Sequence, residues 1–210
     1  MRRLLALLLA APFLLALLAA PASAQTLAPP AGTVARIQGA AVAVRSALPR
    51  ALAVGDAIQV GDVLSTGADA RLEITMQDDS VFVLGAETAF VVTDYTFGQG
   101  KGGATFRVIK GAFLATSGKI AQLADNAMTV QTEIATIGIR GTTVWGGPLD
   151  GVPMQVIMLE GRAVTVENRQ GRVELTTAGA GTWTDGGAPA PAAPWEADKT
   201  ARARATVTFR

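Results

Sequence analysis

The side chains of this chain that could perform acid–base or nucleophilic chemistry are few. The sequence contains neither histidine nor cysteine, which removes the commonest general base, the commonest metal ligand and any thiolate nucleophile. Asp78 and Asp79 are adjacent, and we expect them in a solvated turn, because catalytic carboxylates must converge across a cleft. Ser117 and Lys119 lack the Ser-x-x-Lys spacing of a serine–lysine nucleophile. The sequence therefore predicts no catalytic residue.

Two Gly-Asp pairs, Gly55-Asp56 and Gly61-Asp62, stand six positions apart. They could contribute oxygen ligands to calcium, but a calcium site needs several more carboxylates or carbonyls. No Asp/Asn ladder of that kind follows in the sequence. An aspartate in a turn often accepts hydrogen bonds from its own backbone, so we expect two structural turns. The sequence predicts no metal site and no cofactor.

A second glycine-rich segment surrounds an arginine. Gly138 and Gly141 are expected to allow a tight bend between two strands, and Gly161 is expected at another structural turn. Arg140 either contacts a partner or donates hydrogen bonds to loop carbonyls. Arg140 and Thr142 are therefore the candidate partner contacts.

The segments that must position these turns have the pattern of β-strands. Residues 70–76 alternate apolar and polar side chains, and residues 81–84 follow after a polar turn, which predicts a hairpin. A strand–Gly–strand unit recurs at 37–44 and 159–166, with a looser copy at 108–116. We predict an all-β fold in the form of a roll, a short solenoid or a wrapped sandwich of these repeats.

The C-terminal residues have a different composition. Residues 195–207 form either a short helix or a frayed basic tail, because Ala, Arg and Lys favour helices. In the helical case, Pro194 is expected near the first position. The residues expected to dock on the domain are Trp195, Ala201, Ala205 and Val207.

The N-terminus indicates export. Arg2 and Arg3 precede an apolar run that ends in an Ala-Ser-Ala triplet, which predicts a signal peptide cleaved between Ala24 and Gln25. A membrane anchor is the alternative, because the run is long enough to span a bilayer. We expect a periplasmic protein without a transmembrane anchor after cleavage.

The predicted organisation is a signal peptide at 1–24, a linker at 25–33, a β domain at 34–180, and a Pro/Ala/Gly linker with the possible helix at 181–210. Cleavage removes two of the 18 basic residues, which leaves 16 against 17 acidic residues. This balance gives no attraction for phosphate backbones, so we expect no nucleic-acid partner.

Several ordered motifs resemble one known family. Residues 60–85 contain a Gly-Asp-Val-Leu-Ser-Thr-Gly turn, an alternating strand, an Asp-Asp-Ser turn and a strand ending in Leu-Gly. Residues 132–145 contain the string Ile-Arg-Gly-Thr, and residues 159–166 contain a Glu-Gly hairpin. Together, residues 60–166 resemble the FecR domain.

The resemblance implies a periplasmic β domain. In iron-transport regulators, such a domain relays the occupancy of an outer-membrane receptor to a cytoplasmic sigma factor. Those regulators are usually anchored in the inner membrane, whereas the hydrophobic segment here looks cleavable. We therefore expect a stand-alone exported FecR-like module.

Three functions are compatible with the sequence. The first is a non-catalytic module that binds an envelope protein through exposed strand edges, with Arg140 as a polar anchor. The second is a carbohydrate- or cell-wall-binding module, which requires exposed tryptophans among Trp145, Trp183 and Trp195. The third is a hydrolase that uses only Asp, Ser and Lys, which requires a converging carboxylate pair or a Ser–Lys contact.

Overall fold

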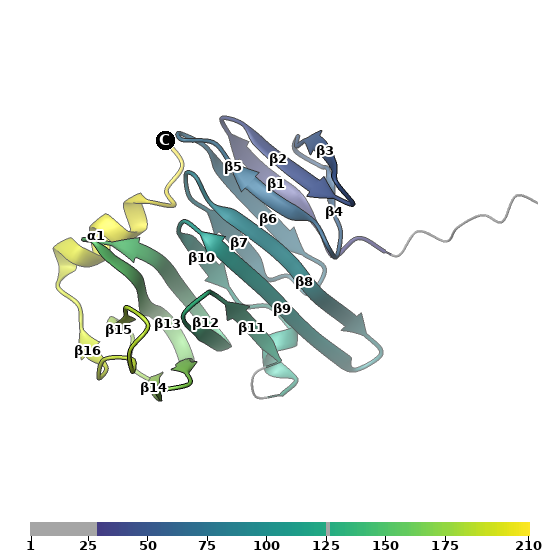
Figure 1. Cartoon of the computed structure of the whole chain (residues 1–210). Coiled ribbons are helices and arrows are strands. Elements are labelled where there is room, and N and C mark those ends of the chain that lie inside the picture. The colour runs from purple at the N-terminus through teal and green to yellow at the C-terminus, as the bar shows by residue number, and fades with distance from the viewer. Residues whose placement is uncertain (1–28, 125–126) are drawn as a thin grey trace, which may run out of the picture.

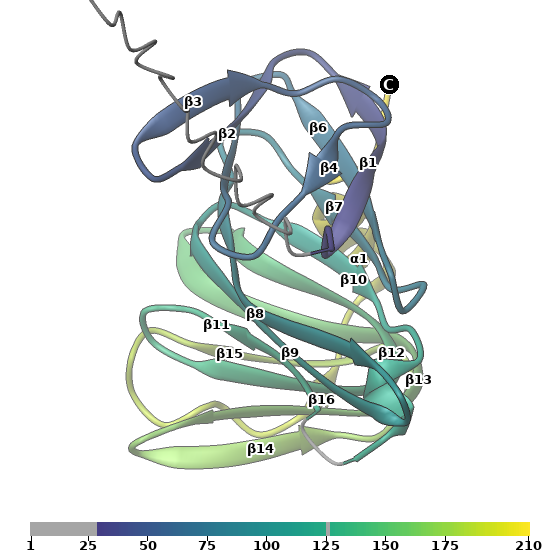
Figure 2. The same cartoon turned by 90° about the vertical axis from the view of Figure 1, so that its right-hand side faces the viewer.

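β-Strands dominate the computed structural model of this chain, which describes residues 29–124 and 127–210 (Figure 1). In these residues, sixteen strands join one continuous hydrogen-bonded sheet, accompanied by one 3-10 turn and one short α-helix. The sheet curls so that its two halves face each other (Figure 2). The predicted all-β class is confirmed, and the architecture is a roll with two layers.

The elements have the following bounds, in chain order: β1 (Gly32–Gln38), β2 (Ala41–Arg45), β3 (Leu48–Ala51), β4 (Ala57–Ile58), β5 (Val63–Thr66), β6 (Arg71–Met76), β7 (Val81–Leu84), β8 (Ala89–Gly98), β9 (Lys101–Lys110), β10 (Phe113–Thr116), η1 (Ile120–Gln122), β11 (Met128–Gln131), β12 (Thr136–Leu149), β13 (Val152–Asn168), β14 (Gly171–Leu175), β15 (Ala180–Thr184), β16 (Ala193–Pro194) and α1 (Ala197–Ala205). The predicted hairpin is confirmed as β6 and β7, and β1 begins inside the predicted linker 25–33.

Two long strands connect the layers. One layer has the order β3-β2-β5-β8-β9-β11, and the other has the order β4-β1-β6-β7-β10. The first half of β12 pairs with β11 and its second half with β10, so β12 belongs to both layers. β13 is its antiparallel partner and adds β14 to one layer and β15 to the other.

The core lies between the layers. Alternate residues of each strand point inward, and the inward set includes the fully buried rings of Phe82, Phe90 and Phe106. These rings pack against one another with centroids 4.4 to 5.4 Å apart. They come from β7 in one layer and from β8 and β9 in the other, so this aromatic cluster fixes the two layers to each other.

The layers meet at a corner where both long strands bend. Gly141 in β12 has φ +60° and Gly161 in β13 has φ +112°. A Cβ on Gly161 would lie 2.2 Å from the carbonyl oxygen of Gly141, so the corner requires glycine there. Gly138, by contrast, is a buried residue inside β12, paired with Thr129 and Thr165. The prediction that Gly138 allows a tight bend is therefore wrong.

Each glycine of the strand–Gly–strand repeat lies at a change of chain direction in the roll. Gly39 separates β1 from β2, and Gly111 separates β9 from β10, whereas Gly161 lies inside β13. All three glycines have positive φ. The repeat therefore marks points where the chain changes direction, and the copy at 159–166 does so without interrupting its strand.

Residues 193–210, here called the C-terminal strap, cross the outer face of one layer (Figure 1). The rings of Trp195 and the fully buried Trp145 are 6.1 Å apart, edge to face. The indole N–H of Trp145 donates a 3.0 Å hydrogen bond to Thr206 Oγ1. Further along, the guanidinium of Arg36 lies 4.1 Å from the centre of the Phe209 ring. The strap thus spans the layer from β15 to β1.

Helix α1 confirms the predicted short helix, although its docking residues differ in part. Trp195 and Val207 pack against the domain as expected, but the buried helical residue is Ala203, and Ala201 and Ala205 are exposed. Pro194 lies in β16, which pairs with β15, and the helix begins three residues later. Residues 181–210 are therefore packed on the domain over much of their length.

Candidate functional site

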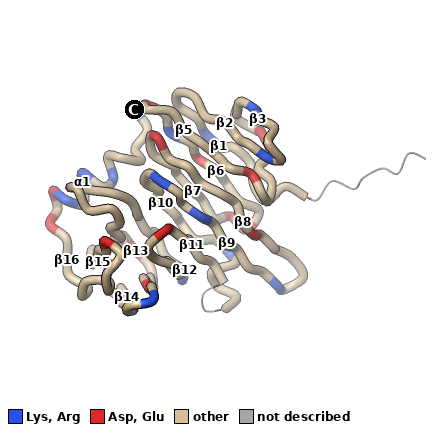
Figure 3. The backbone as a smooth tube through the Cα atoms, in the orientation of Figure 1, with Lys and Arg blue, Asp and Glu red and all other residues tan. Residues whose placement is uncertain are grey.

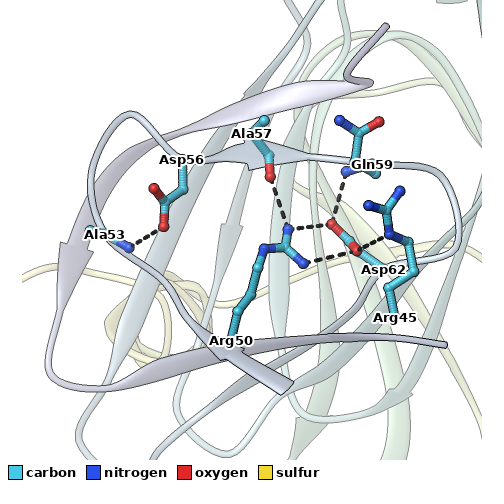
Figure 4. Close-up of polar contacts among 7 residues, drawn as sticks. All are labelled: Arg45, Arg50, Ala53, Asp56, Ala57, Gln59 and Asp62. Atoms are coloured by element: carbon cyan, nitrogen blue, oxygen red, sulfur yellow. Dashed lines mark hydrogen bonds and ion pairs between the residues drawn. The ribbon is translucent and has the colours of Figure 1, made fainter. Parts of the chain in front are cut away.

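The two Gly-Asp turns have the same geometry (Figure 4). In residues 53–56, the Asp56 carboxylate accepts a 2.8 Å hydrogen bond from the Ala53 amide. In residues 59–62, the Asp62 carboxylate accepts a 2.8 Å hydrogen bond from the Gln59 amide. The glycines have positive φ, with Gly55 at +90° and Gly61 at +86°. Each aspartate therefore closes its own turn, which is the arrangement expected from the sequence.

Asp62 has a second role, because its side chain is fully buried. The Arg50 guanidinium donates to both carboxylate oxygens, at 3.1 and 2.6 Å, and Arg45 Nε lies 3.7 Å from Oδ1 (Figure 4). The hydrogen bond to Asp62 raises the pKa of Arg50 above its usual value. The carboxylate thus neutralises an arginine that joins β3 to the turn, and its oxygens are already engaged in the fold.

Asp78 and Asp79 lie in different environments. Asp78 is fully buried, so the prediction of a solvated turn is wrong for this residue. Its carboxylate accepts hydrogen bonds from the Ser80 hydroxyl at 2.5 Å, the Tyr95 hydroxyl at 3.0 Å and the Ile120 amide at 3.1 Å. Burial and the Asp78 charge raise the pKa of Tyr95. Asp78 therefore ties three segments together.

Asp79 completes the same turn at the surface. Its φ is +65°, a conformation that aspartate tolerates better than most residues, and its carboxylate pairs with Lys119 at 2.5 Å. Ser117 Oγ accepts a 2.7 Å hydrogen bond from the Thr142 amide. Neither a converging carboxylate pair nor a Ser–Lys contact is present at these positions. Among the described residues, no group of three or more Asp and Glu side chains could hold a metal ion.

The Arg-Gly-Thr segment separates its two candidate contacts. Thr142 is 3% exposed, and its hydroxyl donates toward the carbonyl oxygens of Arg140 and Ala163, each at 2.9 Å. Its side chain therefore stabilises the corner, and little of it is accessible to a partner. Arg140 is exposed at the same corner. The next residue, Gly141, lines a groove of about 450 Å³, together with residues that include Ser117, Glu160 and Arg162.

The tryptophans do not line a common groove. Trp145 and Trp195 pack against each other beneath the strap, whereas Trp183 on β15 is 45% exposed. One exposed indole does not form the row of tryptophans that the carbohydrate-binding interpretation requires.

Sequence reasoning missed a second groove at the open end of the roll. Val108, Ile109, Ile134, Pro148, Pro153 and Met154 provide its apolar lining, and its volume is about 280 Å³. We call it the open-end groove. Its walls come from β9, from the turn between β11 and β12, and from the tip of the β12–β13 hairpin. The sequence could have indicated only the hairpin tip, through its two prolines.

Comparisons with known proteins identify the class of this roll. The FecR protein family matches residues 62–174, so the chain belongs to that family. Its fold is also similar to two crystal structures of a putative anti-sigma factor from Parabacteroides distasonis ATCC 8503, at 1.65 and 2.50 Å resolution. The TM-scores are 0.52 and 0.53, and the sequences are 16% identical. The match covers 65% of this chain and 61% of those chains, so the similarity spans less than two thirds of their length. No curated protein matches the chain.

The sequence predicts a cleaved signal peptide and no transmembrane anchor in the remaining chain, and these two predictions concern different residues. The predicted cleavage site between Ala24 and Gln25 lies outside the described residues. In residues 29–124 and 127–210, no helix is long and apolar enough to cross a bilayer.

Proposed function

We propose that this chain is a non-catalytic periplasmic sensing module that binds an envelope protein. The observation that carries the proposal is membership of the FecR family over residues 62–174. The engagement of Asp78 and Ser117 in structural hydrogen bonds supports it, because the hydrolase interpretation would use these groups as catalytic residues.

The sequence and the surface support the proposed location and the proposed kind of partner. The signal-peptide pattern that ends at Ala24 supports export into the periplasm. Lys, Arg, Asp and Glu are interspersed over the strands (Figure 3), and the chain without the predicted signal peptide has 16 basic and 17 acidic residues. A mixed surface of this kind suits a protein partner better than a nucleic acid.

Arg140 is the proposed polar contact. It is exposed at the corner, where the Thr142 hydroxyl donates a hydrogen bond to its carbonyl oxygen. The next residue, Gly141, lines a groove that contains Glu160 and Arg162. Guanidinium groups are enriched at binding hot spots, because they combine several donors with a flat apolar surface. A rigid corner would present this group with little loss of conformational entropy.

The proposal is tested by crosslinking in cells, with the tagged full chain as bait and mass spectrometry of the purified adducts. We expect one envelope protein to be enriched over an unrelated exported protein, and Arg140→Ala to reduce its yield. Arg169→Ala is the matched control, because Arg169 is an exposed arginine in the turn between β13 and β14. Adducts with glycan alone, or no enrichment, would contradict the proposal.

A further inference from the structure

The open-end groove lies beside a strand that continues past its neighbour. β11 pairs in parallel with β9 up to Gln131, which is opposite Arg107, whereas β9 continues to Lys110. Among the described residues, Val108 to Lys110 therefore have no strand on that side. Unpaired backbone groups at such an edge can bind another extended segment.

The side chains along this edge are apolar in the middle and basic on either side. Ile109 is 56% exposed and lines the groove, while Val108 is buried beside it. Arg107 and Lys110 are exposed, and in the described part of the chain neither pairs with a carboxylate. The edge thus combines one apolar contact with two cations that form no ion pair with a carboxylate of the described residues.

The opposite wall limits where a charged ligand group can lie. Glu133 lines both the open-end groove and a second groove of about 380 Å³ that shares lining residues with it, so a ligand carboxylate next to Glu133 would be repelled. Near Arg107 and Lys110 the same carboxylate would be attracted. The ligand's acidic groups are therefore expected on the β9 side, and its apolar side chain between Ile109, Ile134 and Pro153.

We propose that the open-end groove binds an extended acidic segment of a protein partner, which lies along Val108–Lys110 and inserts an apolar side chain into the groove. This inference rests on the proposed function, and it names the partner's chemistry and a docking surface separate from the Arg140 corner. The backbone of β9 provides affinity, Ile109 selects an apolar side chain, and the two cations select acidic flanks.

The direct test uses two capped peptides with the same alternating Val-Thr centre, one flanked by glutamates and the other by lysines. Binding to the full chain is followed by backbone amide NMR shifts. We expect the acidic peptide to bind about tenfold more tightly than the basic one, with the largest shifts at Val108–Lys110 and Ile134. Equal affinities, or shifts confined to other strands, would overturn the inference.

Two matched variants locate the site. Ile109→Glu places a negative charge in the groove and should weaken the acidic peptide about tenfold. Leu48→Glu makes the same kind of change at a 74% exposed apolar residue on β3, an edge strand far from β9 in the sheet order, and should leave binding unchanged. Equal effects of the two variants would contradict the inference. Circular dichroism verifies that both variants are folded.

A photoreactive residue placed at position 109 or at position 140 separates this inference from the proposed function. An envelope protein captured from both positions agrees with both proposals. Capture from 140 alone would overturn the groove inference and leave the function standing. Acidic-peptide binding with no envelope protein captured from either position would overturn the function and leave the groove as a peptide site.

Discussion

Gly141 and Gly161 lie against each other at the corner of the roll, where a Cβ on Gly161 would be 2.2 Å from the Gly141 carbonyl oxygen. The Thr142 hydroxyl donates to the carbonyls of Arg140 and Ala163 next to this contact. The close approach allows β12 and β13 to pass together from one layer to the other. The Gly-Thr pair of the family motif is therefore explained by the geometry of the corner.

Gly161→Ala should strongly destabilise the protein, because neither its φ nor the space accepts a side chain. We expect the free energy of unfolding to fall by about 3 kcal/mol or more, measured by urea denaturation. Gly151→Ala is the control on the same hairpin, since Gly151 also has positive φ (+78°) but no atom within 4 Å of an added Cβ. Its cost should be about 1 kcal/mol, from the backbone conformation alone. Similar costs for the two variants would show that the corner can relax.

The sequence predicts the individual strands of this fold better than it predicts which strands pair with each other. The alternation in residues 70–76 and the polar turn after it define β6 and β7, because the period of a strand and the chemistry of a turn are local. The pairing of β9 with β11 is parallel and depends on the path of the chain between them. No local pattern encodes such a pairing, so the choice among roll, solenoid and sandwich required the structure.

The difference between local pattern and long-range pairing also explains the wrong predictions for Asp78 and Gly138. Asp78 has the sequence of a surface turn, but Tyr95 and Ile120 are distant in the chain and enclose it. Gly138 looks like a bend residue, yet two strands pair with it. In both cases long-range packing determines the environment, whereas Asp56 depends on its own turn and matches the local expectation.

Asp62→Asn should destabilise the protein more than Asp56→Asn. Both variants weaken a turn, but only Asp62 is fully buried and receives two hydrogen bonds from Arg50. Because Arg50 is partly exposed and solvent screens the pair, we expect a loss of about 2 kcal/mol for Asp62→Asn and about 1 kcal/mol or less for Asp56→Asn. Urea denaturation measures both, and the opposite order would contradict a structural role for the ion pair.

Tyr95 should make the stability depend on alkaline pH. Its pKa is raised in the folded protein, first by burial and then by the charge of Asp78, whereas an unfolded tyrosine titrates near pH ~10. The folded state therefore favours the neutral phenol. Its contribution to stability is fully present below pH ~10 and is lost as the pH rises from there through the folded-state pKa.

Tyr95→Phe isolates this effect. We expect the variant to be less stable at neutral pH by about 1 kcal/mol, because hydrogen bonds with Asp78 are lost, but to lose less further stability than the parent above pH ~10. Tyr95 is the single tyrosine of the chain, so the absorbance of tyrosinate follows its titration directly. A titration near pH ~10 in the folded parent would contradict the buried environment.

The strap should stabilise the domain through Trp195, whose ring packs against the buried Trp145. Trp195→Ala removes this contact and uncovers the indole of Trp145, so we expect a loss of about 2 kcal/mol and a red shift of the tryptophan fluorescence. Trp183→Ala is the matched control, because its 45% exposed ring lies outside the cluster and should cost less than about 1 kcal/mol. If both variants lost the same stability and the emission stayed blue, the strap would be a loosely attached segment. The apolar outer face around Trp145 would then be covered by something other than the strap.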